Sequence, residues 1–196
     1  MNTKRLLAVF LLFVSFPLAL SADKLMRDCI VNMPDGVLPL LTKVNREDCV
    51  DFIEAGMEAH VTNRLDGTTQ LVALTPDYAL WHYTSVTEIE MKLLPVTDST
   101  HVVCMVHRVL VPRTDSSVCF YDDDWNLLPA DDFLTMPVEA DTLGAVMRTR
   151  VFSLSPSDAS LAVETNSESY EATDVEPSVQ CGQTKVTIVW TDGKFR

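Results

Sequence analysis

The chain has 196 residues and carries 15 Lys and Arg against 28 Asp and Glu, a net charge of −13. Hydrophobic residues make up 47% of the sequence, which excludes a wholly disordered, collagen-like or low-complexity protein. The acidic balance argues against nucleic-acid binding, because the phosphates of DNA or RNA would be repelled.

The first residues, 1–21, have the features of a cleaved secretory signal. Lys4 and Arg5 form a short basic start, and an apolar run extends to Leu20, followed by small residues. The run is shorter than the roughly 20 residues that a membrane-spanning helix needs, and Pro17 interrupts it. We therefore expect export rather than membrane anchoring.

Cleavage is expected after Ser21, with cleavage after Ala22 as the alternative. The mature chain, 22–196, has a length that suits a single α+β domain. None of its segments is long and apolar enough to span a membrane. Because the chain would leave the cytoplasm, we expect to find it in the periplasm or the cell envelope.

Five cysteines would be exported with the chain, into an environment where disulfides persist. Because their number is odd, at least one is free or pairs with another chain. We favour small buried side chains over bridges, since free cysteines are often buried. The five are Cys29, Cys49, Cys104, Cys119 and Cys181.

Two amphipathic helices are predicted at the start of the domain. Residues 24–33 carry apolar side chains at helical spacing, and Pro34 ends the helix. Asn45 is the expected N-cap of a second helix over 46–57, with Asp48 at its third position as in a capping box. Each helix has an apolar face, which needs a surface to pack against.

From residue 59 onward the hydrophobic pattern changes to that of strands. Runs over 59–65 and 68–74 flank Asp66-Gly67, a pair typical of a two-residue hairpin turn. Four more strand runs follow across short links, and short links require antiparallel neighbours in a meander. These runs are 78–84, 87–94, 101–111 and 117–121.

The last third of the chain has a weaker pattern. Residues 122–142 are acidic and irregular, 143–147 suggest a helical turn, and 148–154 with 160–164 form a hairpin. Residues 165–183 are polar and are predicted to be a long mobile loop, before a final strand. The fold class is therefore α+β, with two N-terminal helices packed on a mainly antiparallel meander sheet of about eight or nine strands.

The densest charge feature is an acidic turn. Asp122, Asp124 and Asp131 supply carboxylates of the kind that bind calcium, which makes them candidate metal ligands. However, the EF-hand pattern requires a central glycine, which this turn lacks. A solvated turn is the interpretation that we favour.

No known catalytic arrangement is recognisable in the sequence. It contains no GxSxG, HExxH or CxxC motif and no glycine-rich phosphate loop. Cys104 and His107 are three residues apart on one predicted strand, so their side chains would point to opposite faces. We therefore assign no catalytic residue, expect no cofactor, and lean towards a protein that is not an enzyme.

Aromatic side chains near the acidic turn are a candidate binding surface. Tyr121 and Trp125 would form an exposed aromatic patch there. Aromatic residues on strands are more often part of a core or of cross-strand pairs, and this is the competing interpretation.

Four segments resemble a family of exported proteins from Gram-negative anaerobes of the gut and mouth, which is known only as a domain of unknown function. The segments are 32–57, 90–109, 115–133 and 189–195, and they include the patterns MPD…LPLLT, DCxDF and SxxFYDxDWxxLP. The resemblance implies a periplasmic or cell-envelope protein. It implies no activity, cofactor or catalytic residue.

These observations favour a non-enzymatic envelope protein that binds a partner protein or an envelope ligand. An edge strand of the sheet would accept the partner. Two alternatives stay open at this point. One is a metal-dependent hydrolase that uses the acidic turn over 122–132, and the other is a structural accessory subunit.

Overall fold

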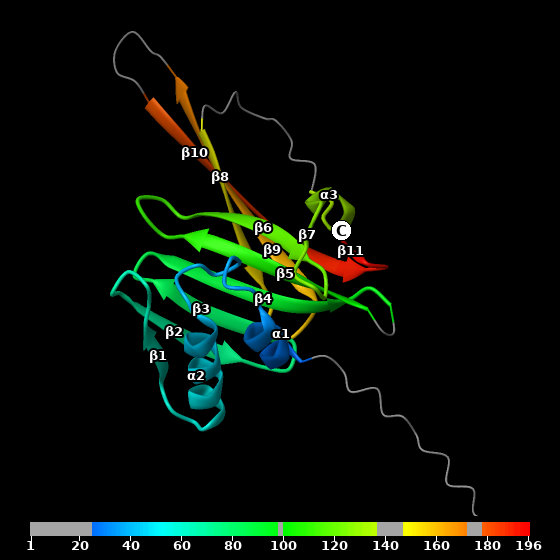
Figure 1. Cartoon of the computed structure of the whole chain (residues 1–196). Coiled ribbons are helices and arrows are strands. Elements are labelled where there is room, and N and C mark those ends of the chain that lie inside the picture. The colour runs from blue at the N-terminus through cyan, green and yellow to red at the C-terminus, as the bar shows by residue number, and fades with distance from the viewer. Residues whose placement is uncertain (1–24, 98–99, 137–146, 172–177) are drawn as a thin grey trace, which may run out of the picture.

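A central antiparallel sheet carries packed side chains on both of its faces. The computed structural model describes residues 25–97, 100–136, 147–171 and 178–196. Two helices lie on one face of this sheet and a second sheet lies on the other (Figure 1). The expected α+β class is confirmed. Among the described helices, none has the length and apolar character needed to cross a membrane.

The central sheet is the predicted meander, in which each strand pairs with the next one along the chain in the antiparallel direction. Its strands are β1 (Ala59–Thr62), β2 (Thr68–Leu74), β3 (Tyr78–Thr84), β4 (Thr87–Pro95), β5 (His101–Val109), β6 (Asp115–Tyr121) and β7 (Leu127–Leu128). The helices are α1 (Met26–Asn32), α2 (Lys43–Glu54) and the short α3 (Ala130–Phe133).

The remaining strands form a second sheet instead of extending the first. They are β8 (Met147–Leu154), β9 (Ser160–Glu171), β10 (Ser178–Thr191) and β11 (Lys194–Phe195), in the order β11-β10-β9-β8. The single sheet of about eight or nine strands that we expected is thus divided into two, of seven and four strands. The reason is that β4 and β5 each have a run of consecutive buried residues whose side chains point to both faces, so both faces of the central sheet need a cover.

Each face of the central sheet has its own hydrophobic core. On the helix side, Met26 of α1 and Cys49 of α2 pack with Trp81 of β3. On the other side, Phe120 of β6 packs with residues of the second sheet such as Leu161 of β9. The chain is therefore built in three layers, and β4 and β5 lie at the centre.

A buried arginine organises the helical layer. The guanidinium of Arg46, on α2, donates hydrogen bonds to the carbonyl oxygens of Ile30, Met33 and Leu41. It also donates to the carboxylate of Asp35 at 3.0 Å, and this bond lowers the pKa of Asp35 below its ordinary value. These bonds hold the connection between α1 and α2 against α2.

Helix α2 begins earlier than predicted. Its N-cap is Thr42, whose Oγ1 accepts a hydrogen bond from the backbone N–H of Asn45 at 3.1 Å. In return, Oδ1 of Asn45 accepts one from the backbone N–H of Thr42 at 3.1 Å. The prediction of Asn45 as N-cap is therefore wrong: it is the third helical residue of a capping box that Thr42 opens.

The β1–β2 turn is longer than the predicted two-residue turn. Thr62 pairs with Thr68, so the loop covers residues 63–67. Oδ1 of Asn63 accepts hydrogen bonds from the backbone N–H groups of Leu65 and Gly67, at 3.0 and 3.1 Å. The Asn63 side chain, together with Asp66 in the left-handed region at φ 58°, closes this loop.

The predicted mobile loop over 165–183 is wrong for the residues that the structure describes. Strand β9 continues to Glu171 and β10 starts at Ser178, and the two pair without interruption from Val189 and Ser160 to these ends. Figure 1 shows this pair, the β9–β10 ribbon, projecting beyond the body. Of the helical turn predicted over 143–147, residues 143–146 lie outside the described residues, and Met147 begins β8.

A buried ion pair joins the two sheets. Nη2 of Arg108, on β5, donates to Oε1 of Glu90, on β4, at 2.9 Å. The same nitrogen donates to the carbonyl oxygen of Phe152 and to Oγ of Ser153 on β8, both at 2.8 Å. The second oxygen of Glu90 accepts the backbone N–H of Leu154 at 2.6 Å. The pair therefore fixes β8 on β4 and β5.

Arg108→Leu is expected to destabilise the protein by about 3–5 kcal/mol, because it leaves the Glu90 carboxylate buried without its cation. Urea-induced unfolding measures this free energy. The control is Arg196→Leu, whose ion pair with Asp192 is exposed, so the expected loss is below about 1 kcal/mol. Equal losses for the two variants would contradict the structural role of Arg108.

Cysteine labelling tests the placement of the five thiols, none of which forms a disulfide with another described cysteine. Cys29, Cys49 and Cys104 are buried, as expected, whereas Cys181 is exposed on β10. Burial raises the pKa of Cys49 to about 11 and also raises the pKa of Cys104 and of Cys119, which disfavours the reactive thiolate. Ellman's reagent should therefore label Cys181 rapidly in the folded chain, and Cys181→Ser should abolish the rapid phase. A rapid phase that survives this substitution would contradict the arrangement.

Candidate functional site

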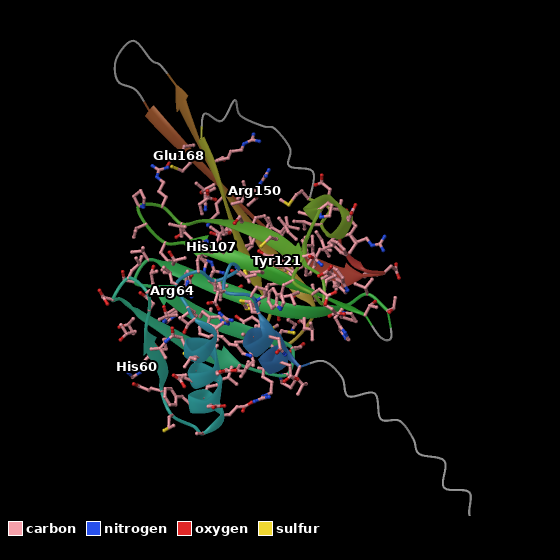
Figure 2. All side chains as sticks on the ribbon, in the orientation of Figure 1. His60, Arg64, His107, Tyr121, Arg150 and Glu168 are labelled. Atoms are coloured by element: carbon pink, nitrogen blue, oxygen red, sulfur yellow. The ribbon has the colours of Figure 1, made fainter. Side chains whose placement is uncertain are left out.

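The predicted aromatic patch is not exposed. Trp125 is only 9% exposed and packs in the helix-side core, and its ring centroid lies 5.4 Å from that of Tyr121. Burial raises the pKa of Tyr121, which Figure 2 places over the central sheet, to about 12. The residues are therefore brought together as predicted, but in the core. The prediction of an exposed patch is wrong, because the φ of 64° at Trp125 belongs to a tight turn that returns the indole to the sheet.

The acidic turn is organised by one of its own carboxylates. Oδ1 of Asp122 accepts hydrogen bonds from the backbone N–H groups of Asp124 and Asn126, at 2.9 and 2.8 Å. Its Oδ2 accepts from the Asn126 side chain at 2.9 Å. Asp131 lies apart from this turn, on α3. Among the described residues, no three His, Cys, Asp or Glu side chains are grouped as metal ligands would be.

Cys104 and His107 lie on opposite faces of β5, as predicted. Cys104 belongs to the core between the sheets, whereas the His107 ring lies 6.5 Å from that of Tyr83 on the helix side. Burial lowers the pKa of His107. This separation argues against a thiol–imidazole pair at these two residues.

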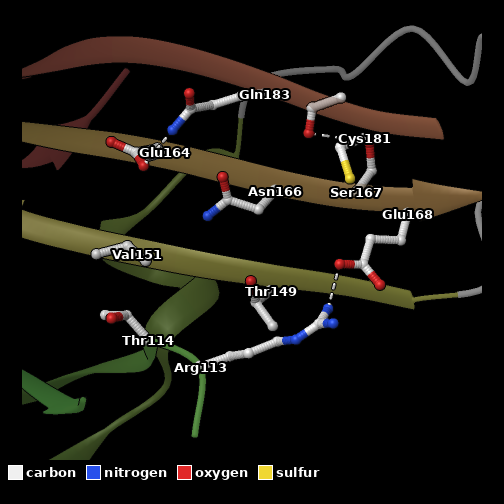
Figure 3. Close-up of a pocket in the computed structure, with 11 residues that line it drawn as sticks. Arg113, Thr114, Thr149, Val151, Glu164, Asn166, Ser167, Glu168, Cys181 and Gln183 are labelled. Carbon is white, nitrogen blue, oxygen red and sulfur yellow. Dashed lines mark hydrogen bonds and ion pairs between the residues drawn. The ribbon is translucent and has the colours of Figure 1, made fainter. Parts of the chain in front are cut away.

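A large hollow lies on the second sheet, on the ribbon that the sequence did not predict. It has a volume of about 700 Å³ and is open to solvent, and we call it the ribbon trough (Figure 3). Thr149, Asn166 and Gln183 are cross-strand neighbours on β8, β9 and β10, and all three line it. The Gln183 amide donates to a carboxylate oxygen of Glu164 at 2.6 Å. The floor of the ribbon trough is therefore a row of hydroxyl, amide and carboxylate groups.

One wall of the ribbon trough comes from the central sheet. Arg113, in the β5–β6 connection, forms an ion pair with Glu168 of β9 (Figure 3). Glu168 lies where β9 projects beyond the body (Figure 2). Ser167 donates its hydroxyl hydrogen to the carbonyl oxygen of Gly182 at 3.3 Å. A side chain at Gly182 would collide with this hydroxyl, since a Cβ there would lie 2.7 Å from Oγ of Ser167. The ribbon trough thus offers hydrogen-bonding groups, but the hydroxyl hydrogen of Ser167 is already donated to a backbone carbonyl oxygen.

Beside the trough, β10 forms a long edge of the second sheet. One side of β10 pairs with β9 over residues 178–189. On its other side β10 pairs with β11 only at Trp190 and Thr191, and Val189 bonds to Arg196. Among the described residues, the outer side of 178–188 has no strand partner. The sequence suggested edge strands in general but located none of them on this ribbon.

Comparison with known proteins shows a solved structure with a similar fold and identifies the family of the chain. A solved domain of an uncharacterized protein from Porphyromonas gingivalis W83 superposes with a TM-score of 0.66. The two are 22% identical, over 87% of this chain and 96% of that chain, and at this identity the likeness concerns the fold alone. No curated protein matches the chain. A family model described as "Protein of unknown function (DUF3256)" matches residues 18–190, so the chain belongs to the DUF3256 family of proteins of unknown function.

Proposed function

We propose that the chain is an exported protein of the cell envelope that binds a partner protein by strand addition and is not an enzyme. The basic start and apolar run of residues 1–21 support export. The binding role rests on one observation, the long edge of β10 over residues 178–188. An extended segment of a partner adds to such an edge through backbone hydrogen bonds.

The direction of the backbone groups on β10 follows from its last residues. The N–H and the C=O of Val189 bond to Arg196, at 3.0 and 3.2 Å, so both point away from β9. The N–H of Trp190 bonds to Ala159 at 2.8 Å, on the β9 side. Backbone groups alternate between the two sides of a strand. Since the β9–β10 register has no break, Lys185 presents its N–H and C=O to the outer edge.

The side chains along this edge suit a partner strand. Thr184, Thr187 and Val186 are β-branched and exposed, Val186 to 42%, and β-branched residues favour strand pairing. Lys185 lies between them and is also exposed. A lysine on an edge discourages indiscriminate pairing and favours a strand with an acidic residue opposite it. We therefore propose an extended partner segment that carries an acidic residue.

The ribbon trough extends the same binding surface. Gln183 lines the trough and, by the alternation along β10, also presents its backbone to the outer edge. A strand added to β10 would therefore lie beside the amide of Gln183 and its partner Glu164. Polar side chains on that face of the partner have hydrogen-bonding groups within the trough. The backbone would then supply affinity and the trough would supply specificity.

Lys185→Pro tests the edge without removing a bond of the β9–β10 ladder. Proline removes the outward N–H of Lys185, and strand edges tolerate proline where the N–H faces outward. The tagged mature chain is mixed with an envelope extract of the cells that produce it, and its stoichiometric partner is quantified. We expect Lys185→Pro to reduce the retained partner at least about tenfold, a loss measured against the wild-type chain.

The matched control is Lys185→Ala, which removes the side chain and keeps the N–H. It should retain most of the partner, because the backbone bond is preserved. Val186→Pro checks the geometry: its N–H points towards β9, so it should lower the unfolding free energy, whereas Lys185→Pro should not. Equal retention by the Pro and Ala variants at position 185, or the lack of a stoichiometric partner of the wild type, would refute the proposal.

A further inference from the structure

A second hollow, of about 610 Å³, lies at one end of the central sheet. The β1–β2, β3–β4 and β5–β6 connections meet there, because successive turns of a meander alternate between its two ends. We call it the end groove, and define it by five of the residues that line it. These are Leu40, Leu65, His82, Glu88 and Leu110.

The floor of the end groove is a cross-strand row of three polar residues. Gln70, His82 and Glu88 are successive neighbours across β2, β3 and β4, and all three line the groove. Arg108 of β5 is the next neighbour in this row, beside Glu88. Oε2 of Glu88 accepts a hydrogen bond from Nη1 of Arg108 at 2.6 Å. Oε1 lies 3.6 Å from Nε2 of His82, which is beyond hydrogen-bonding distance. The second carboxylate oxygen of Glu88 thus retains its capacity to accept a donor from a ligand.

The three ionised side chains at this row do not balance in charge. Glu88 and Glu90 carry two negative charges, and the Arg108 guanidinium between them carries one positive charge. These three groups together therefore leave one negative charge. Both oxygens of Glu90 are occupied, by Arg108 and by the Leu154 N–H, and Glu90 is buried. The surplus charge is therefore presented at Glu88, whose side chain is 22% exposed towards the groove.

Glu88 is held in place before any ligand arrives. Its partner Arg108 is itself bonded to Phe152 and Ser153 of the second sheet. A carboxylate held in this way loses little conformational entropy when it binds a cation. The groove therefore combines a net negative charge with a preorganised acceptor.

The walls of the end groove are apolar. Leu40, Leu65 and Leu110 line it, and Leu65 is 74% exposed although it is a large aliphatic residue. Val86 and Val111, on neighbouring connections, are exposed as well. Exposed apolar side chains gathered around a hollow with a few polar groups are typical of a ligand site.

We propose that the end groove binds a small organic cation with a short apolar tail. The ammonium group donates to Oε1 of Glu88, a charge-assisted hydrogen bond, and the tail packs on Leu65 and Leu110. This site is separate from the β10 edge, so its test is independent of the test of partner binding.

Calorimetric titration of the mature chain with hexylammonium chloride tests the proposal. Hexanol has the same tail without the charge, and hexanoate has the opposite charge. We expect hexylammonium to bind about tenfold more tightly than hexanol, with hexanoate the weakest of the three. Equal binding of hexylammonium and hexanol would overturn the proposal, because the carboxylate would then contribute nothing.

Two pairs of variants locate the site. Glu88→Gln should weaken hexylammonium binding about tenfold, whereas Glu58→Gln, the same charge change at an exposed residue of the α2–β1 connection, should leave it unchanged. Leu65→Ala should weaken it about threefold, whereas Leu127→Ala, at another exposed leucine, should not.

Equal effects of Glu88→Gln and Glu58→Gln would reduce the binding to the overall negative charge of the protein and refute the site. If Glu88→Gln fails to fold, as judged by circular dichroism, the proposal is tested by two other comparisons. These are Leu65→Ala against Leu127→Ala, and hexylammonium against hexanol. Leu65 is exposed, so its replacement leaves the core intact.

Discussion

The buried pair of Arg108 and Glu90 is the interaction on which both candidate sites depend. A guanidinium removed from water needs acceptors for its N–H groups, and the two terminal nitrogens of Arg108 find them on β4 and on β8. This need fixes where β8 crosses the central sheet. Since β9 and β10 pair onto β8 in turn, the position of the ribbon trough and of the β10 edge follows from it. The same guanidinium orients Glu88 in the end groove.

The double burial of the central sheet explains the three layers. Trp81 and Met91 point to the helices, whereas Cys104 and Phe120 point to the second sheet. A sheet with one apolar face needs a single cover, but this sheet needs two. The helices supply one, and β8 to β11 supply the other. The outer strand β10 contributes Ile188 to the core between the sheets, whereas residues 183–187 of the same strand are exposed at the surface.

Sequence patterns predicted the elements that have an apolar face or an apolar run, and they missed those with few apolar residues. The two N-terminal helices have an apolar face, β4 and β5 are largely buried runs, and short links indicated that the strands from β1 to β6 are antiparallel neighbours. The part of the ribbon formed by 165–171 and 178–183 is rich in polar residues, so its composition resembled that of a loop. A strand of this kind is stabilised by its ladder of backbone bonds, which leaves no hydrophobic pattern in the sequence.

By itself, the sequence determined the α+β class, the two N-terminal helices and the antiparallel meander from β1 to β6, because short connections and local periodicity act over a few residues. Only the tertiary structure decided that Trp125 is buried, that Gln183 lies on a strand edge, and that Glu88 and Leu65 share a groove. These outcomes depend on strand register and on the packing of one sheet on another. Both are set by contacts between residues far apart in the chain, which local periodicity does not encode.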